Sequence, residues 1–167
     1  MRAFTRRTYR GPVELIRDIC FLMGNRSLVK KAMDSGGISF GFRERLMMVV
    51  TEVNGCRYCS WYHSAQSIKA GLSQDELDAL LAGQIPGGAP EEEVPALAYA
   101  QHWAQMNAKP EADAMRRLTD IYTEDRAAQI NIVLRMIRMG NLLGNTLDKL
   151  LYMVCFGRLG LTERDAR

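Results

Sequence analysis

The stretch FRERLMMVVTEV at residues 42–53 decides the fold, together with the Asn54-Gly55 pair and the segment CRYCSWYH at residues 56–63 that follow it. In the first segment, apolar residues recur at the spacing of one helix face, namely at Leu46, Val49, Val50 and Val53. The Asn-Gly pair interrupts this pattern, and a second helical segment begins at once. The sequence therefore predicts two helices, at residues 42–53 and 56–70, joined by a very short turn.

Helical patterns also dominate the rest of the chain, and strand alternation bounded by turn residues is nowhere sustained. Gly71 predicts the end of the second helix, and Ser73 with Glu76 predicts a capping box at the start of the next one. Gly140 and Gly144 are candidate breaks in the last helix. We expect an all-α protein, a single-domain helical bundle, with further helices at residues 13–23, 27–33, 73–81, 91–108, 111–122 and 123–151.

The composition is that of one globular domain. The chain has 167 residues, of which 47% are hydrophobic and 25% charged, with 5 Pro, and this excludes intrinsic disorder and a collagen-like structure. A domain of this size buries roughly 68–70% of its unfolded surface, so it needs no disulfide framework. We expect a single domain over residues 1–167, whose 4 cysteines are free for other work.

The charge pattern gives no support for nucleic-acid or membrane partners. The formal net charge is only +3, and basic residues cluster only near the start of the chain, at Arg2, Arg6, Arg7 and Arg10. The apolar segment behind this cluster is interrupted by charges and is not a signal-peptide core, and no window approaches the roughly 18 uncharged apolar residues of a spanning helix. We expect a cytoplasmic protein whose thiols stay reduced.

Two thiols and an imidazole share one face of the helix predicted at residues 56–70. Residues three and four apart on a helix are neighbours, so Cys59 lies beside Cys56 on one side and His63 on the other. The unpaired N–H groups at a helix start favour a thiolate, and a cysteine in the first turn can reach disulfide geometry where one in the helix interior cannot. The pattern indicates a pair that cycles between dithiol and disulfide.

Glu44 is connected to this face through the predicted turn. If the two helices fold back on each other at Asn54, Glu44 lies ten residues before the turn and His63 nine after it, or about 15 Å and 13–14 Å along the helices. We expect Glu44 to orient His63 and raise its basicity, while the other ring nitrogen faces Cys59. Tyr58, between the cysteines, is a candidate hydrogen-bond donor to the thiolate.

Simpler interpretations of the same residues stay open. Two cysteines three apart on a helix also occur as core residues. Cys56, Cys59 and His63 supply three ligands for a metal, although no second Cys or His cluster completes a structural zinc site. Glu44 is equally suited to a surface ion pair with a neighbouring arginine.

Other residues of chemical interest receive structural interpretations. Cys20 and Cys155 have no partner by spacing and are predicted to be buried apolar thiols. Tyr58, Trp61 and Tyr62 are expected either to line a small apolar pocket or to pack against a neighbouring subunit.

One known family combines these features. The chain resembles the alkylhydroperoxidase D-like branch of the carboxymuconolactone decarboxylase family in the arrangement Arg43-Glu44, Asn54-Gly55-Cys56-x-Tyr58-Cys59-x-x-x-His63. Later patterns are similar as well, at Ala96-Leu-Ala-Tyr-Ala, Lys109-Pro110, Tyr122-Thr-Glu-Asp, Asn141 and Asn145. The resemblance covers residues 38–151 and implies an all-helical, oligomeric, thiol-dependent peroxidase. The sequence suggests no bound cofactor or metal.

By position, the resemblance also implies a role for each residue. Cys59 is the expected peroxidatic thiol, Cys56 the resolving thiol, and His63 with Glu44 the proton relay. The best-studied members carry a histidine between the cysteines, where this chain has Tyr58, a candidate donor to the peroxide. The implied substrate is an organic hydroperoxide, the implied reductant a lipoyl domain or a thioredoxin-like protein, and the implied assembly a trimer, hexamer or dimer.

Two other functions fit part of the pattern. A disulfide relay or redox sensor needs only Cys56 and Cys59 and shows no peroxide turnover. A non-redox reaction of the decarboxylase type that names the family uses acid-base groups without thiols, and the Cys-x-x-Cys pair argues against it.

Overall fold

The computed structural model describes residues 3–34 and 36–166, and every regular element within them is helical. The all-α prediction is thus confirmed. In chain order the elements are α1 (Pro12–Gly24), α2 (Arg26–Met33), α3 (Phe40–Asn54), α4 (Arg57–Lys69), α5 (Gln74–Leu81), α6 (Val94–Gln105), α7 (Ala112–Ile121), α8 (Glu124–Val154) and the short 3-10 helix η1 (Glu163–Ala166).

Helix α3 is the centre of the fold. It packs against α4, α5, α6 and α8, and 10 of its 15 residues are buried. Its start is fixed by Ser39, whose side-chain oxygen accepts a hydrogen bond from the backbone N–H of Phe42 at 3.2 Å. The apolar pattern at residues 42–53 therefore lies inside the bundle, as the sequence predicts.

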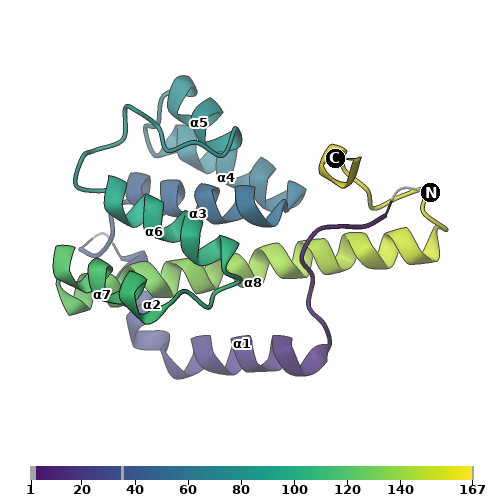
Figure 1. Cartoon of the computed structure of the whole chain (residues 1–167), viewed down its shortest axis with the longest axis horizontal. Helices are drawn as coiled ribbons and strands as arrows, with labels where there is room; N and C mark the ends of the chain where they lie inside the picture. Colours follow the sequence, from purple (N-terminus) through teal and green to yellow (C-terminus); the bar gives the residue numbers. More distant parts are fainter. Residues whose placement is uncertain (1–2, 35, 167) are drawn as a thin grey trace.

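Helix α8 runs along the whole molecule, with α1 on one side of it and α3 and α6 on the other (Figure 1). It is continuous over 31 residues, so the candidate breaks at Gly140 and Gly144 are wrong. A glycine in a helix interior costs about 1 kcal/mol relative to alanine. Packing of α8 against α1, α2, α3 and α4 offsets this cost and keeps the helix intact.

The reversal between α3 and α4 is as short as predicted. Gly55 ends α3 with a φ of 71°, in the left-handed region that favours glycine, and its N–H donates to the carbonyl of Thr51 at 2.8 Å. Cys56 follows in an extended conformation as the N-cap of α4. Two residues thus turn the chain back, so that α4 packs against α3.

The remaining helix boundaries match the predictions except in α6. The capping box at Ser73 and Glu76 is present, but α6 covers Val94–Gln105 and not residues 91–108. Pro95 lies in its first turn, where its missing N–H is tolerated, and the three preceding glutamates form a turn. At the other end, Asn107 and Ala108 have positive φ values of 54° and 62°, which end the helix before Pro110.

The first and the last described segments of the chain lie near the C-terminal end of α8 (Figure 1). Arg6, from the N-terminal basic cluster, is buried there and contacts Asp148 of α8 at 2.7 Å and Asp165 of η1 at 2.9 Å. Arg2, from the same cluster, lies outside the described residues. Among the helices that the structure describes, none is long and apolar enough to cross a membrane.

Candidate active site

Cys56 and Cys59 are joined by a disulfide, with their Cα atoms 5.4 Å apart. Cys56 is not part of α4 but its N-cap, with φ −79° and ψ 105°, and its Sγ accepts a hydrogen bond from the N–H of Cys59. This non-helical backbone supplies the freedom that a cysteine pair inside a helix lacks. Cys56 is only 1% exposed, whereas Cys59 is half-buried.

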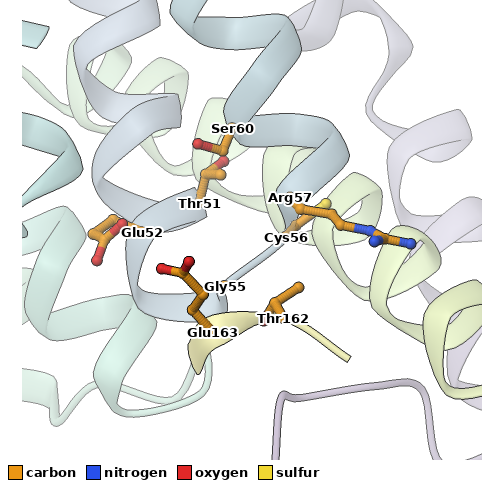
Figure 2. Close-up of a pocket in the computed structure, with 8 residues that line it drawn as sticks. All are labelled: Thr51, Glu52, Gly55, Cys56, Arg57, Ser60, Thr162 and Glu163. Carbon is orange, nitrogen blue, oxygen red and sulfur yellow. The ribbon is translucent and has the colours of Figure 1, made fainter. Parts of the chain in front are cut away.

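A glycine of α8 makes room for the buried sulfur. A Cβ at Gly144 would lie 2.8 Å from Sγ of Cys56 and 3.3 Å from Cδ2 of Tyr58, both tighter than ordinary packing allows. Figure 2 shows the sulfur of Cys56 pointing toward the ribbon of α8. Gly144 therefore lets the start of α4 approach α8 closely.

His63 of α4 and Glu44 of α3 form a direct pair, with 2.7 Å between Nδ1 and Oε2. Both side chains are largely buried, at 13% and 5% exposure. A carboxylate only accepts hydrogen bonds, so Nδ1 carries the hydrogen and Nε2 is the ring nitrogen left for other chemistry. The structure thus brings together Glu44 and His63, which the sequence predicted to lie at equal distances from the turn. Glu44 is buried and is not a solvated surface charge.

Cys59 and His63 open into one cavity of about 370 Å³. Its other walls are mainly apolar and come from α3, α4 and α8, and they are formed by Met47, Tyr58, Tyr62, Met136, Ile137 and Gly140. The ring of Tyr62 stands edge-on to that of His63, with 5.1 Å between centroids. Tyr58 and Tyr62 thus line an apolar pocket as expected, but Trp61 is 77% exposed and does not line it.

Tyr58 directs its hydroxyl to a buried carboxylate. The hydroxyl donates to Oδ1 of Asp148 at 2.7 Å and accepts from Nη2 of Arg57 at 2.9 Å. Arg57 also binds Asp148 directly, at 2.6 Å. The hydrogen bond to Tyr58 and the charge of Asp148 raise the pKa of the Arg57 guanidinium. The ring of Tyr58 therefore lines the cavity, while its donor hydrogen is used by Asp148.

Two asparagines of α8 hold the turn between α3 and α4. Nδ2 of Asn145 donates to the carbonyl of Asn54 at 2.8 Å, and Nδ2 of Asn54 donates to Oδ1 of Asn141 at 3.1 Å. Asn141 in turn donates to the hydroxyl of Thr51 at 3.0 Å. All these groups are buried, so the network fixes the position at which α4 begins.

Sequence reasoning assigned no role to these α8 residues or to Asp148. The sequence contains a pattern that indicates such a role, because Asn141, Asn145 and Asp148 recur at the spacing of one helix face within a mostly apolar segment. A buried polar stripe of this kind requires partners, which here are the turn, Tyr58 and the N-terminal arm.

A second cavity, of about 270 Å³, is lined by Cys56 but not by Cys59 (Figure 2). It is lined by the end of α3, the start of α4 and the C-terminal segment, at Thr51, Glu52, Gly55, Cys56, Arg57, Ser60, Thr162 and Glu163. Glu52 thus lies at the Cys56 end of the site, whereas Glu44 lies at the His63 end.

The remaining cysteines are not the buried thiols that the sequence suggested. Cys20 is exposed and Cys155 is half-buried. Cys20 lies on α1, in which no residue is buried and which packs along the outside of α8 and α2. In the described part of the chain, no group of three or more His, Cys, Asp or Glu side chains is arranged to hold a metal ion.

Comparison with known families agrees with this site. Residues 24–102 match the model of the Carboxymuconolactone decarboxylase family. This part of the chain, slightly less than half of its length, is similar to that family. The match contains Glu44, both cysteines of the disulfide and His63, and it confirms the resemblance indicated by the motif. It ends at residue 102, whereas the resemblance was expected to extend to residue 151. No curated protein and no solved structure matches the chain significantly.

The matched segment supplies α3 and α4, and therefore the disulfide and the Glu44–His63 pair. Helix α8 lies beyond the matched residues, yet it provides one wall of the cavity and the asparagines that hold the turn. A disulfide-capable Cys-x-x-Cys pair in this family is consistent with its alkylhydroperoxidase D-like branch and fits a redox role.

Proposed function

We propose that this protein is a thiol-dependent peroxidase that reduces organic hydroperoxides through Cys59 and Cys56. The observation that supports it most strongly is the cavity that Cys59 and His63 share, together with the contact by which Glu44 occupies Nδ1 of the imidazole. This arrangement leaves Nε2 to exchange a proton near the thiol.

In the first step, His63 takes the proton of the Cys59 thiol, and the thiolate attacks the terminal oxygen of the hydroperoxide. The O–O bond breaks, Cys59 becomes a sulfenic acid, and the departing alkoxide receives the proton from His63 to leave as an alcohol. Glu44 stabilises the imidazolium that forms between these two transfers.

In the second step, the Cys56 thiol attacks the sulfenic sulfur of Cys59 and releases water, which gives the disulfide. The N-cap position of Cys56 permits this bond without unfolding of α4. The two electrons lost by the thiols equal those gained by the peroxide.

A dithiol reductant then restores the site. Cys59 is the more accessible partner in the disulfide, since Cys56 is 1% exposed and packs against Gly144. We propose that a reductant thiolate attacks Cys59 and displaces Cys56, and that its second thiol releases Cys59 from the mixed disulfide. A slender dihydrolipoyl arm of a lipoyl domain suits a sulfur inside a cavity; a thioredoxin-like protein is the other candidate.

The apolar cavity distinguishes this proposal from a disulfide relay between proteins. A relay needs only a disulfide that a partner thiolate can reach, whereas a peroxidase also needs space for its substrate, and Cys59 lines a cavity with Met47 and Met136. A small organic substrate fits these surroundings better.

We also propose that the chain forms a homo-oligomer in the cytoplasm, where dithiol reductants are available. Helix α1 exposes a row of large apolar side chains, and so does the end of α8; they include Val13, Ile16, Met23, Leu150, Met153 and Val154. Several large apolar side chains exposed on one element are typical of an interface between subunits.

Trapping of the sulfenic acid tests the proposed chemistry directly. In Cys56→Ser, one equivalent of cumene hydroperoxide should yield a sulfenic acid at Cys59, which dimedone captures and mass spectrometry locates. Cys20→Ser serves as a control, because Cys20 is the exposed thiol outside the site. A dimedone adduct at Cys20 with none at Cys59 would contradict the proposal.

A further inference from the structure

Gly140 lies in the wall of the cavity that contains Cys59 and His63. It is in the interior of α8, one turn after Met136 and one turn before Gly144. Glycine is the least favourable helix residue after proline, so a glycine at this position calls for a physical reason.

Packing supplies that reason for Gly144 but not for Gly140. A Cβ at Gly144 would meet Sγ of Cys56 at 2.8 Å, whereas a Cβ at Gly140 would have no other side chain or distant backbone within 4 Å. No neighbour therefore requires the absence of a side chain at Gly140. Open space lies beside Gly140, and Gly140 lines the cavity.

The surroundings of this space are apolar. Met47, Met136 and Ile137 form the wall around it, and the disulfide sulfur of Cys59 lies across from α8 on α4. A cavity of about 370 Å³ is within the range of small-molecule sites and far exceeds the needs of hydrogen peroxide. It has room for a bulky apolar group attached to the peroxide.

We propose that Gly140 is a specificity-determining residue: its missing side chain admits the aromatic or branched apolar group of an organic hydroperoxide whose terminal oxygen reaches Cys59. This inference rests on the proposed peroxidase function. A Cβ at this position meets no neighbour, so we expect a leucine here to extend into the open space and exclude the bulky group.

The first test compares two substrates. The ratio of kcat/KM for cumene hydroperoxide to kcat/KM for hydrogen peroxide should fall at least about 10-fold in Gly140→Leu. The matched control is Gly24→Leu, which places the same side chain at the end of α1, also in open space but outside the cavity. An unchanged ratio of the two kcat/KM values in Gly140→Leu would overturn the inference. An equal loss of both activities, with a change of oligomeric state measured by light scattering, would overturn it as well.

A second test does not depend on turnover. In a Cys56→Ser background, Cys59 is alkylated by N-phenylmaleimide or N-methylmaleimide, and peptide mass spectrometry follows the rate at this residue alone. Gly140→Leu should lower the phenyl-to-methyl rate ratio at least about 10-fold, and equal ratios in the two proteins would refute the role of Gly140. Failure of wild-type protein to consume any hydroperoxide would refute the proposed function instead, and the alkylation result would still decide the inference.

Discussion

Oε2 of Glu44 lies 2.7 Å from Nδ1 of His63, although the two residues are separated by 19 positions and lie on different helices. The contact exists because Gly55 and Cys56 reverse the chain within two residues, and because Asn141 and Asn145 hold that turn against α8. The orientation of the imidazole therefore depends on the core of the fold and not on a mobile loop.

Removal of the imidazole should slow peroxide reduction. A positioned acid-base group contributes about 10²- to 10⁴-fold to a rate, so His63→Ala should lower kcat/KM for cumene hydroperoxide by that factor. Glu44→Gln should have a smaller effect, since the amide still reaches Nδ1 but no longer stabilises the imidazolium.

The chain offers a matched control for this pair. His102 and Glu111 form a similar contact, at 2.8 Å, on the surface and outside the cavity of Cys59. His102→Ala should retain full activity. Equal losses in His63→Ala and His102→Ala, measured with the same reductant, would argue against the proton relay.

The two glycines of α8 should respond in opposite ways to alanine. Gly144→Ala places a Cβ 2.8 Å from Sγ of Cys56, so it should lower the free energy of unfolding by about 1–3 kcal/mol, as overpacking does. Gly140→Ala meets no neighbour and should raise this free energy by up to about 1 kcal/mol. Urea unfolding of both variants provides the measurement, and equal effects would show that the start of α4 is not packed closely on α8.

Loss of the Tyr58 hydroxyl should affect stability more than turnover. The hydroxyl donates to Asp148, so Tyr58→Phe should lower the free energy of unfolding by about 1 kcal/mol. Its ring still lines the cavity, and kcat should remain within about threefold of wild type, far less than the loss of a catalytic acid. A kcat loss of tenfold or more would indicate instead that Tyr58 donates to the peroxide during turnover.

The contact between the chain ends should make stability depend on pH in the acid range. Burial acts to raise the pKa of Asp165, but hydrogen bonds from the N–H groups of Thr5 and Thr162 and the charge of Arg6 lower it to about 2. Since this value lies below the ordinary 3.8, the carboxylate stabilises the fold above about pH 4, and the contribution is lost as the pH falls to 2.

Comparison of wild type with Asp165→Asn isolates this contribution. The wild type should be more stable by about 2 kcal/mol at pH 7, and the difference should shrink between pH 4 and pH 2. A difference that stays constant over this range would show that the ionised form of Asp165 has no special role.

Local sequence patterns were sufficient to predict the half of the site that lies on α3 and α4. The apolar spacing before Asn54, the Asn-Gly turn and the cysteine spacing act over a few residues, so they place Glu44 level with His63 without knowledge of any other helix. The role of α8 could not be predicted in this way, because a helical pattern shows which residues share a face but not what that face contacts.

Local sequence patterns also could not predict which charged residues are buried. Arg6 and Asp148 are buried together although such residues are mostly exposed, and their pairing joins segments 142 positions apart. Cys20 and Cys155 are the opposite case, since thiols are mostly buried and these two are not. In both cases tertiary packing overrides the average preference of the residue.

The most direct test of the account is consumption of cumene hydroperoxide with a dihydrolipoyl reductant by wild type and by Cys59→Ser, with free thiols counted before and after oxidation. We expect turnover by wild type with two thiols oxidised, at Cys56 and Cys59, and no turnover by Cys59→Ser. Turnover that persists in Cys59→Ser, or a wild type that forms the disulfide but consumes no hydroperoxide, would contradict it.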